Sequence, residues 1–275
     1  MIQKRSGSKG VSTLTILAIF FIFSLSVPTM ADNIVNKLTI VQKHSSEYIQ
    51  SIYNKIDFDK AAVLNPKVFE YAYRGFVNLK ASGRLTSAQD IITICDYTLS
   101  SNLKRMWILD LKANKLLLNT YVAHGQGTGE EFATTFSNKE NSHQSSIGFY
   151  LTGDTYQGQH GLSLYLHGMD ENYNSAAYQR AIVLHGAHYV SESFIQQNKR
   201  LGRSWGCPAV SNELAPEIIN LIKGGTCLFS FYQNEKYLST SMWLNNNASQ
   251  FQNRFELATP LQPEETELNP LIAQD

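Results

Sequence analysis

The sequence lacks several features on which whole protein classes depend. Its 275 residues include only three cysteines, which excludes a fold held together by dense disulfides. Basic and acidic residues balance at 23 each, and no local basic stripe occurs, so nothing in the charge pattern favours nucleic-acid binding. No internal repeat or low-complexity tract occurs. With 43% hydrophobic and 17% charged residues, the chain has enough apolar surface to bury a core, and wholesale disorder is excluded.

The first 31 residues have the pattern of a targeting segment. Lys4, Arg5 and Lys9 form a basic head, an uncharged apolar run covers 11–27, and small residues follow up to Ala31. Residues 1–31 are therefore predicted to be a signal peptide or, if uncleaved, a membrane anchor. In both cases the rest of the chain faces a periplasmic or other extracytoplasmic space, and contact with a membrane is expected only through this segment. Its removal leaves 20 basic against 23 acidic residues, because it holds three of the 23 basic groups.

The remaining chain divides by pattern into three parts. Residues 32–84 show apolar positions three and four apart and predict an all-helical N-terminal region, in which Pro66 begins a second helix that ends near Gly83. Residues 85–235 are predicted to form one domain, which holds the candidate catalytic residues described below. Residues 236–275 predict a polar C-terminal tail, with a short amphipathic piece around Trp243.

The central part contains short apolar or alternating runs separated by Gly, Asn and Ser. These runs predict seven strands at 91–95, 106–111, 116–122, 147–151, 162–166, 181–184 and 227–232. Two helices are predicted at 190–198 and 215–223, the second with Pro216 in its first turn and two glycines after its end. The predicted fold class is α+β, with a mainly antiparallel sheet or sandwich as the catalytic domain.

Two segments carry the residues best suited to chemistry. One is an apolar strand that ends in His185 and Gly186, and the other places Cys207 between Gly206 and Pro208, where a helix cannot continue. A turn of this kind exposes a thiol, and the amides of Gly206 and Cys207 are expected to point at the oxygen of an attacked carbonyl. A cysteine nucleophile needs a base to take its proton, and His185 is the candidate, with its second nitrogen held by a backbone carbonyl such as that of Gly186.

Other interpretations of these residues stay open. Cys95 and Cys227 lie in apolar strands and are expected to be buried, although a disulfide between them is not excluded. Zinc is a rival use for Cys207 and the histidines, but neither His-Glu-x-x-His nor Cys-x-x-Cys occurs, so no metal site is predicted. The glycine-rich loop 125–129 lacks the Gly-Lys-Ser/Thr ending of a phosphate loop, which argues against nucleotide binding.

The motif around these two residues resembles a known family. His185-Gly186, followed 22 positions later by Cys207 within Ser204-Trp205-Gly206-Cys207, resembles the catalytic motif of the YkuD-type L,D-transpeptidases. The similarity extends to the murein L,D-transpeptidase branch through the segments 145–150 and 161–164, through Arg180, and through 202–210. It covers about residues 85–232. The sequence departs from the common motif at Trp205 and Ala209, where the family usually has His and Arg, and the longer interval between His and Cys indicates an enlarged loop at 190–198 that acts as a lid.

The resemblance implies an acyltransferase that uses no cofactor. Cys207 would attack a peptidoglycan stem tetrapeptide, release D-Ala and form a thioester, which an amine on a second stem would resolve as a 3-3 cross-link. His185 and Gly186 would serve catalysis, and Gly206 and Ser204 the oxyanion or the turn. Arg203, Arg180, Tyr165 and His188 are the candidates for substrate binding. Two alternatives remain: an L,D-carboxypeptidase on the same substrate, in which water resolves the thioester, or a non-catalytic murein-binding envelope protein.

Overall fold

A computed structural model describes residues 46–246 of the chain. The predicted signal peptide or anchor at 1–31, the first part of the predicted helical region and the end of the predicted tail lie outside these residues. No helix within 46–246 is long and apolar enough to span a bilayer.

The centre of the fold is an eight-stranded sheet with the order β3-β2-β1-β8-β4-β5-β6-β7. Its strands are β1 (Ile91–Asp96), β2 (Met106–Asp110), β3 (Lys115–Thr120), β4 (Gly148–Gly158), β5 (Gly161–Gly168), β6 (Val183–Ala187), β7 (Ala209–Ser211) and β8 (Cys227–Phe231). The seven predicted strands are confirmed with shifted ends, whereas β7 has only three residues and was not predicted.

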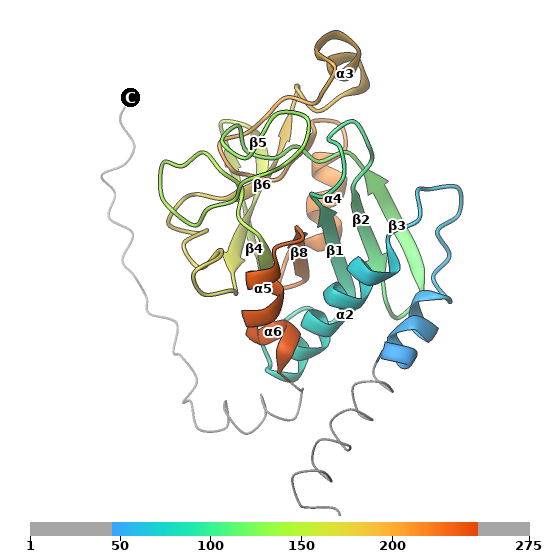
Figure 1. Cartoon of the computed structure of the whole chain (residues 1–275). Helices are drawn as coiled ribbons and strands as arrows, with labels where there is room; N and C mark the ends of the chain where they lie inside the picture. The colour runs from blue at the N-terminus through green and yellow to red at the C-terminus, as the bar shows by residue number, and fades with distance from the viewer. Residues whose placement is uncertain (1–45, 247–275) are drawn as a thin grey trace, which may run out of the picture. The chain divides into compact units, whose positions relative to one another are not determined.

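The sheet is mixed rather than purely antiparallel. Five of its neighbouring pairs are antiparallel, but β1 pairs with β8, and β6 with β7, in parallel. Beyond β3, the amide of Ala123 donates to the carbonyl of Ala209 in β7 at 2.8 Å, which links the two edges of the sheet. The sheet is therefore nearly closed, and Figure 1 labels its strands from β3 at one side to β4, β5 and β6 at the other.

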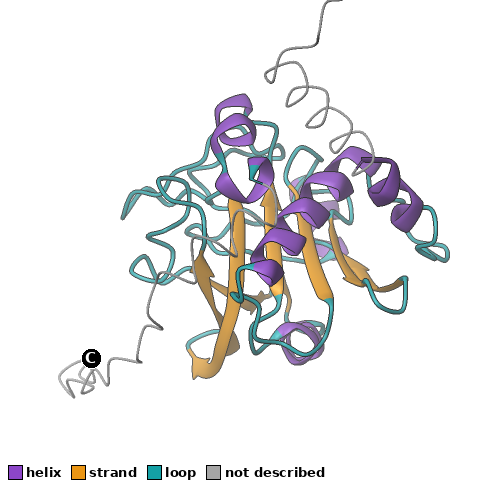
Figure 2. Ribbon diagram, turned by 90° about the horizontal axis from the view of Figure 1, so that it is seen from below, coloured by secondary structure: helices purple, strands orange, loops and turns teal. Residues whose placement is uncertain are grey.

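Helix α2 (Pro66–Ala81) packs on one face of this sheet. It begins where the sequence predicts, since the side chain of Asn65 accepts from the amide of Lys67 at 2.8 Å. A Cβ on Gly75 would lie 1.9 Å from the ring of Phe149, so glycine is required for this close approach. Figure 2 shows helices lying across the strands.

Side chains alternate between two cores because successive strand residues point to opposite faces. In β1, Ile92 and Ile94 face α2, whereas Ile91 and Cys95 face the second core, which α4 (Ala215–Ile222) covers. The predicted helices at 190–198 and 215–223 are confirmed as α3 (Glu192–Asn198) and α4.

The boundary predicted at 84/85 separates two patterns of sequence, and the described part of the region before it packs on the sheet through α2. The segment 46–84 is not all helical, because Asp57 forms a β-bridge with Lys115 between its helices. Beyond β8, α5 (Glu235–Thr240) and α6 (Met242–Asn245) pack beside α2 and bury Tyr237 and Trp243. The described beginning of the predicted tail is thus part of the fold, and the amphipathic piece expected around Trp243 is α6.

Candidate active site

His185 lies in the middle of β6, not at the end of a strand as the sequence predicts. The apolar run of the sequence marks only the first part of this strand, which continues through His185 and Gly186 to Ala187. The imidazole is buried, and its Nδ1 lies 2.8 Å from the carbonyl oxygen of Gly186. A carbonyl only accepts, so Nδ1 carries the proton and Nε2 offers a lone pair.

The environment of His185 keeps it neutral. Burial lowers the pKa of the imidazole, the bond to Gly186 opposes this effect, and neighbouring His160 lowers the pKa further. The rings of His160 and His185 stack with their centroids 4.4 Å apart. A neutral imidazole with a free Nε2 is the form that can accept a proton from a thiol.

Cys207 lies in the turn that leads into β7. Because β6 and β7 run parallel with His185 opposite Ala209, Cys207, two residues before Ala209, comes near Val183, two residues before His185. The amide of Val183 is 3.5 Å from the Cys207 sulfur, which itself lies 3.6 Å from the carbonyl oxygen of Ala181. The two candidate residues thus lie on β6 and on the turn that enters the adjoining strand β7, with the thiol directed at a backbone carbonyl.

All three cysteines are free; Cys207 is half-buried as a residue, whereas Cys95 and Cys227 are buried, as expected. Burial of the sulfur raises the pKa of Cys207, and the Val183 amide, the charge of Arg180 and the amide of Cys207 oppose that rise. The resting residue is therefore a protonated thiol that needs a base.

Ser204 fixes the turn around the cysteine. Its hydroxyl donates to the Cys207 carbonyl at 2.6 Å and accepts from the Gly206 amide at 3.1 Å. The Gly206 amide is thus already engaged, rather than directed at a substrate oxygen as the sequence suggests. Gly206 has φ 126°, and a Cβ there would lie 2.8 Å from the Gln144 carbonyl oxygen, so the position requires glycine. This geometry favours the structural role of Ser204.

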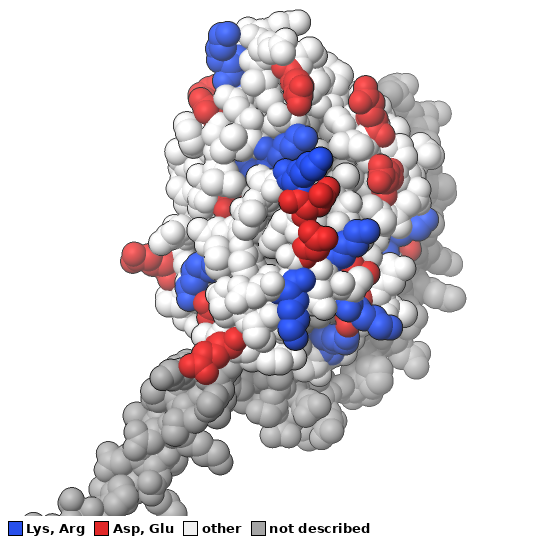
Figure 3. Space-filling model, turned by 90° about the vertical axis from the view of Figure 1, so that its right-hand side faces the viewer, with Lys and Arg blue, Asp and Glu red and all other residues white. Residues whose placement is uncertain are grey.

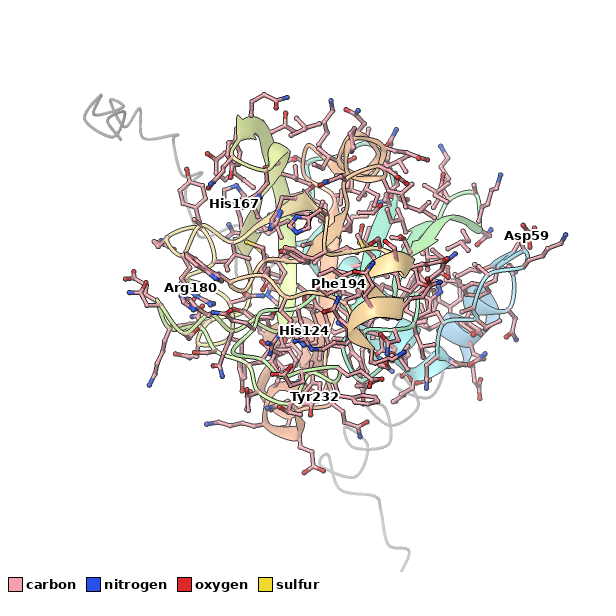
Figure 4. All side chains as sticks on the ribbon, turned by 90° about the horizontal axis from the view of Figure 1, so that it is seen from above. Asp59, His124, His167, Arg180, Phe194 and Tyr232 are labelled. Carbon is pink, nitrogen blue, oxygen red and sulfur yellow. The ribbon has the colours of Figure 1, made fainter. Side chains whose placement is uncertain are left out.

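The guanidinium of Arg180 is engaged by hydrogen bonds to the protein, so it does not present free donors to a substrate. Its guanidinium donates to the carbonyl oxygens of Ser137 and Gln144 and to the hydroxyls of Ser142 and Ser146, at 2.5 to 3.2 Å. Figure 4 labels it beside the loops at one side of the molecule, with His167 near the β4–β5 hairpin and His124 closer to the centre.

Arg203 is likewise occupied. It pairs with Glu130 at 2.7 Å and donates to the carbonyl of Gly129 at 3.0 Å. Figure 3 shows basic and acidic side chains interspersed over one face of the molecule, so ion pairing of this kind is available on that surface. The sequence suggested substrate binding by both arginines, but in this structure their donors bind the protein itself.

The other two candidates differ in exposure, since Tyr165 is half-buried and His188 is exposed. Tyr165 is opposite Val183 across β5 and β6 and stacks on Tyr156, with ring centroids 4.6 Å apart. His188 follows β6 and, with His160 and Gly186, lines a cavity of about 440 Å³. Tyr165 is thus paired with the first residue of β6, and His188 directly follows the last residue of β6.

Trp205 is an exposed aromatic side chain two residues before Cys207. Its ring stacks on that of His143, with centroids 4.8 Å apart and planes 8° from parallel. The sequence marks Trp205 only as a departure from the family motif, and it gives no signal for His143 or for the stacking of His160 on His185. Within residues 46–246, no group of three or more His, Cys, Asp or Glu side chains is placed to hold a metal ion.

The L,D-transpeptidase catalytic domain family matches residues 60–231, which is more than half of the chain. The chain belongs to this family. The match begins before α2, in agreement with the packing of that helix on the sheet. No curated protein sequence matches the chain.

Several solved L,D-transpeptidases are similar in fold. One from Mycobacterium smegmatis has 8% identity and a TM-score of 0.33, with 52% of this chain and 59% of that chain covered. One from Mycobacterium tuberculosis has 11% identity and a TM-score of 0.31, with 52% and 58% covered. A mutant from Enterococcus faecium has 12% identity and a TM-score of 0.31, with 52% and 50% covered. The chain thus spans 50% to 59% of the length of these relatives, and the L,D-transpeptidase assignment rests on the family match.

Proposed function

We propose that this protein is a cysteine-dependent L,D-transpeptidase that acts on peptidoglycan stem peptides in an extracytoplasmic compartment. The observation that carries the proposal is the parallel pairing of β6 and β7, which sets Cys207 beside the strand that holds His185. The neutral, Nδ1-protonated state of His185 supports its role as the base. The exported location follows from the targeting pattern of 1–31.

Acylation begins with rotation of the Cys207 side chain away from the Ala181 carbonyl toward His185. Nε2 of His185 takes the thiol proton, and the sulfur attacks the carbonyl that precedes the terminal D-Ala of a tetrapeptide stem. As the C–N bond breaks, His185 returns the proton to the departing amine of D-Ala, and a thioester remains. The Cys207 amide stabilises the oxyanion, and the Gly206 amide joins it when it releases the Ser204 hydroxyl.

An amine of a second stem then resolves the thioester and forms a 3-3 cross-link. Water in the same position would give L,D-carboxypeptidase activity, and binding without turnover would indicate a murein-binding protein. Both acyl-transfer outcomes use the thiol and the neutral imidazole, whereas binding without turnover gives these two groups no role.

The test is incubation of the full-length protein with a disaccharide tetrapeptide, followed by chromatography of the products. We expect release of D-Ala and formation of cross-linked dimers, both abolished in Cys207→Ala. Intact-mass analysis after treatment with a carbapenem should place one adduct on Cys207, because Cys95 and Cys227 are buried. Binding of the muropeptide without D-Ala release, or an adduct on another cysteine, would refute the proposal.

A further inference from the structure

Trp205 differs from the other two tryptophans of the chain. Its side chain is 71% exposed, whereas Trp107 and Trp243 are 1% and 3% exposed. Two residues of backbone span at most about 7 Å, so the Cα of Trp205 lies within that distance of the Cα of Cys207. An exposed indole two residues from the proposed nucleophile offers an aromatic face that a bound ligand can contact.

The orientation of this indole is fixed before any ligand binds. His143 covers one of its faces, and the His143 ring is held in turn by the side-chain amide of Gln126, 2.9 Å from Nδ1. The backbone of His143 has φ 52°, a conformation that costs energy for a residue with a side chain, and its carbonyl accepts from the Gly127 amide at 2.9 Å. The loop that carries His143 is held by the four hydrogen bonds of Arg180. A rigid platform with one open face loses little entropy on binding.

The chemistry of an indole face selects the group that can occupy it. The π-face carries negative potential, so it repels a carboxylate and attracts a cation, for which Trp is the best of the aromatic side chains. In the proposed reaction, the cation that must approach the sulfur is the ammonium group of the acyl acceptor.

We propose that the open face of Trp205 binds the side-chain ammonium of the acceptor stem peptide and holds it beside the thioester on Cys207. This inference rests on the proposed function. The ammonium gives a proton to Nε2 of His185, and the resulting amine attacks the thioester carbonyl. The new N–C bond forms as the C–S bond breaks, and the sulfur takes the proton from His185. Of the two protons left on the nitrogen, one is released to solvent and one stays on the amide. Trp205 thereby favours the amine over water as the acceptor.

Binding can be tested without turnover in the full-length Cys207→Ala chain. Iodide quenching of tryptophan fluorescence reports Trp205 selectively, because the other two tryptophans are buried. A tripeptide stem with a free side-chain amine should protect the fluorescence from iodide, and the same stem with that amine acetylated should bind about 3- to 30-fold more weakly, the range of a cation–π contact. Trp205→Leu should remove the quenchable signal, which confirms its source. Equal protection by the two stems, or protection by neither, would overturn the inference.

The second test measures how the thioester divides between transfer to the amine and hydrolysis by water. With Cys207 intact, the ratio of cross-linked to hydrolysed product should fall in Trp205→Leu and be partly retained in Trp205→Phe. This ratio is set after acylation, so a change in folding or in the amount of active enzyme does not alter it. An unchanged ratio in Trp205→Leu would overturn the inference. If the wild-type chain released no D-Ala while the Cys207→Ala chain still preferred the free amine, the proposed function would fail and the ammonium site would stand.

Discussion

Replacement of Ser204 by alanine tests whether this side chain holds the turn of the nucleophile. The hydroxyl makes two hydrogen bonds, and its loss leaves the Gly206 amide and the Cys207 carbonyl without that partner. An unsatisfied buried group costs about 1 to 3 kcal/mol, and less where the group is only partly buried, as the Cys207 carbonyl is, so we expect Ser204→Ala to lower the free energy of unfolding by about 2 to 4 kcal/mol. For a domain of this size, that corresponds to a fall in Tm of about 4 to 16 °C.

The assay combines thermal unfolding with the rate at which a carbapenem acylates Cys207 at 25 °C. Domains of this kind are stable by about 5 to 15 kcal/mol, so the variant stays folded at that temperature, and slower acylation would reflect a displaced turn. Ser204→Thr keeps the hydroxyl and is the matched control, with a smaller loss expected in both measurements. If Ser204→Ala had the Tm and the acylation rate of the wild type, the hydroxyl would not hold the turn and our reasoning would be refuted.

Three further predictions address two charged side chains and one constrained glycine. In Arg180→Met, loss of the cation should raise the pKa of Cys207, so alkylation of Cys207 by iodoacetamide at pH 7 should slow. The rate should fall more than in Arg180→Lys, which keeps the charge, and equal rates in the two variants would contradict this electrostatic role. Burial raises the pKa of Asp170 to about 6 from 3.8, so its ionisation should lower the free energy of unfolding by about 3 kcal/mol as pH rises from 4 to 6. Unfolding curves of Asp170→Asn should lack this dependence on pH. Gly206→Ala should reduce acylation at least tenfold because its Cβ would meet Gln144, and wild-type rates would show that the turn adopts another conformation.

The sequence predicted the strands and helices better than their ends. Apolar runs located seven of the eight strands, since each run buries side chains on a strand. Only β7 was missed, because three residues after Pro208 are too few to establish a period. The position of His185 was misjudged for a related reason: Gly186 reads as the end of a strand in the sequence, whereas in the fold it occupies a ladder position opposite Val210.

The roles of the two arginines show what a single sequence does not contain. Arg180 and Arg203 lie near the motif, and the family resemblance made them candidates for substrate binding. Their actual partners are loop carbonyls, hydroxyls and a carboxylate, many of them 34 to 77 positions away along the chain. No periodic pattern records such pairs, because they depend on how the loops fold over one another.

The sequence alone determined which residues are the candidates for catalysis and which family the motif resembles, because a turn-bound cysteine and a strand histidine are identifiable from their neighbours. Tertiary structure decided the geometry. The parallel register of β6 and β7 sets Cys207 beside the strand of His185, and His143 meets Trp205 although 62 positions separate them. The physical reason is that strand order and loop packing are fixed by burial of the whole sheet, a property that no local segment possesses.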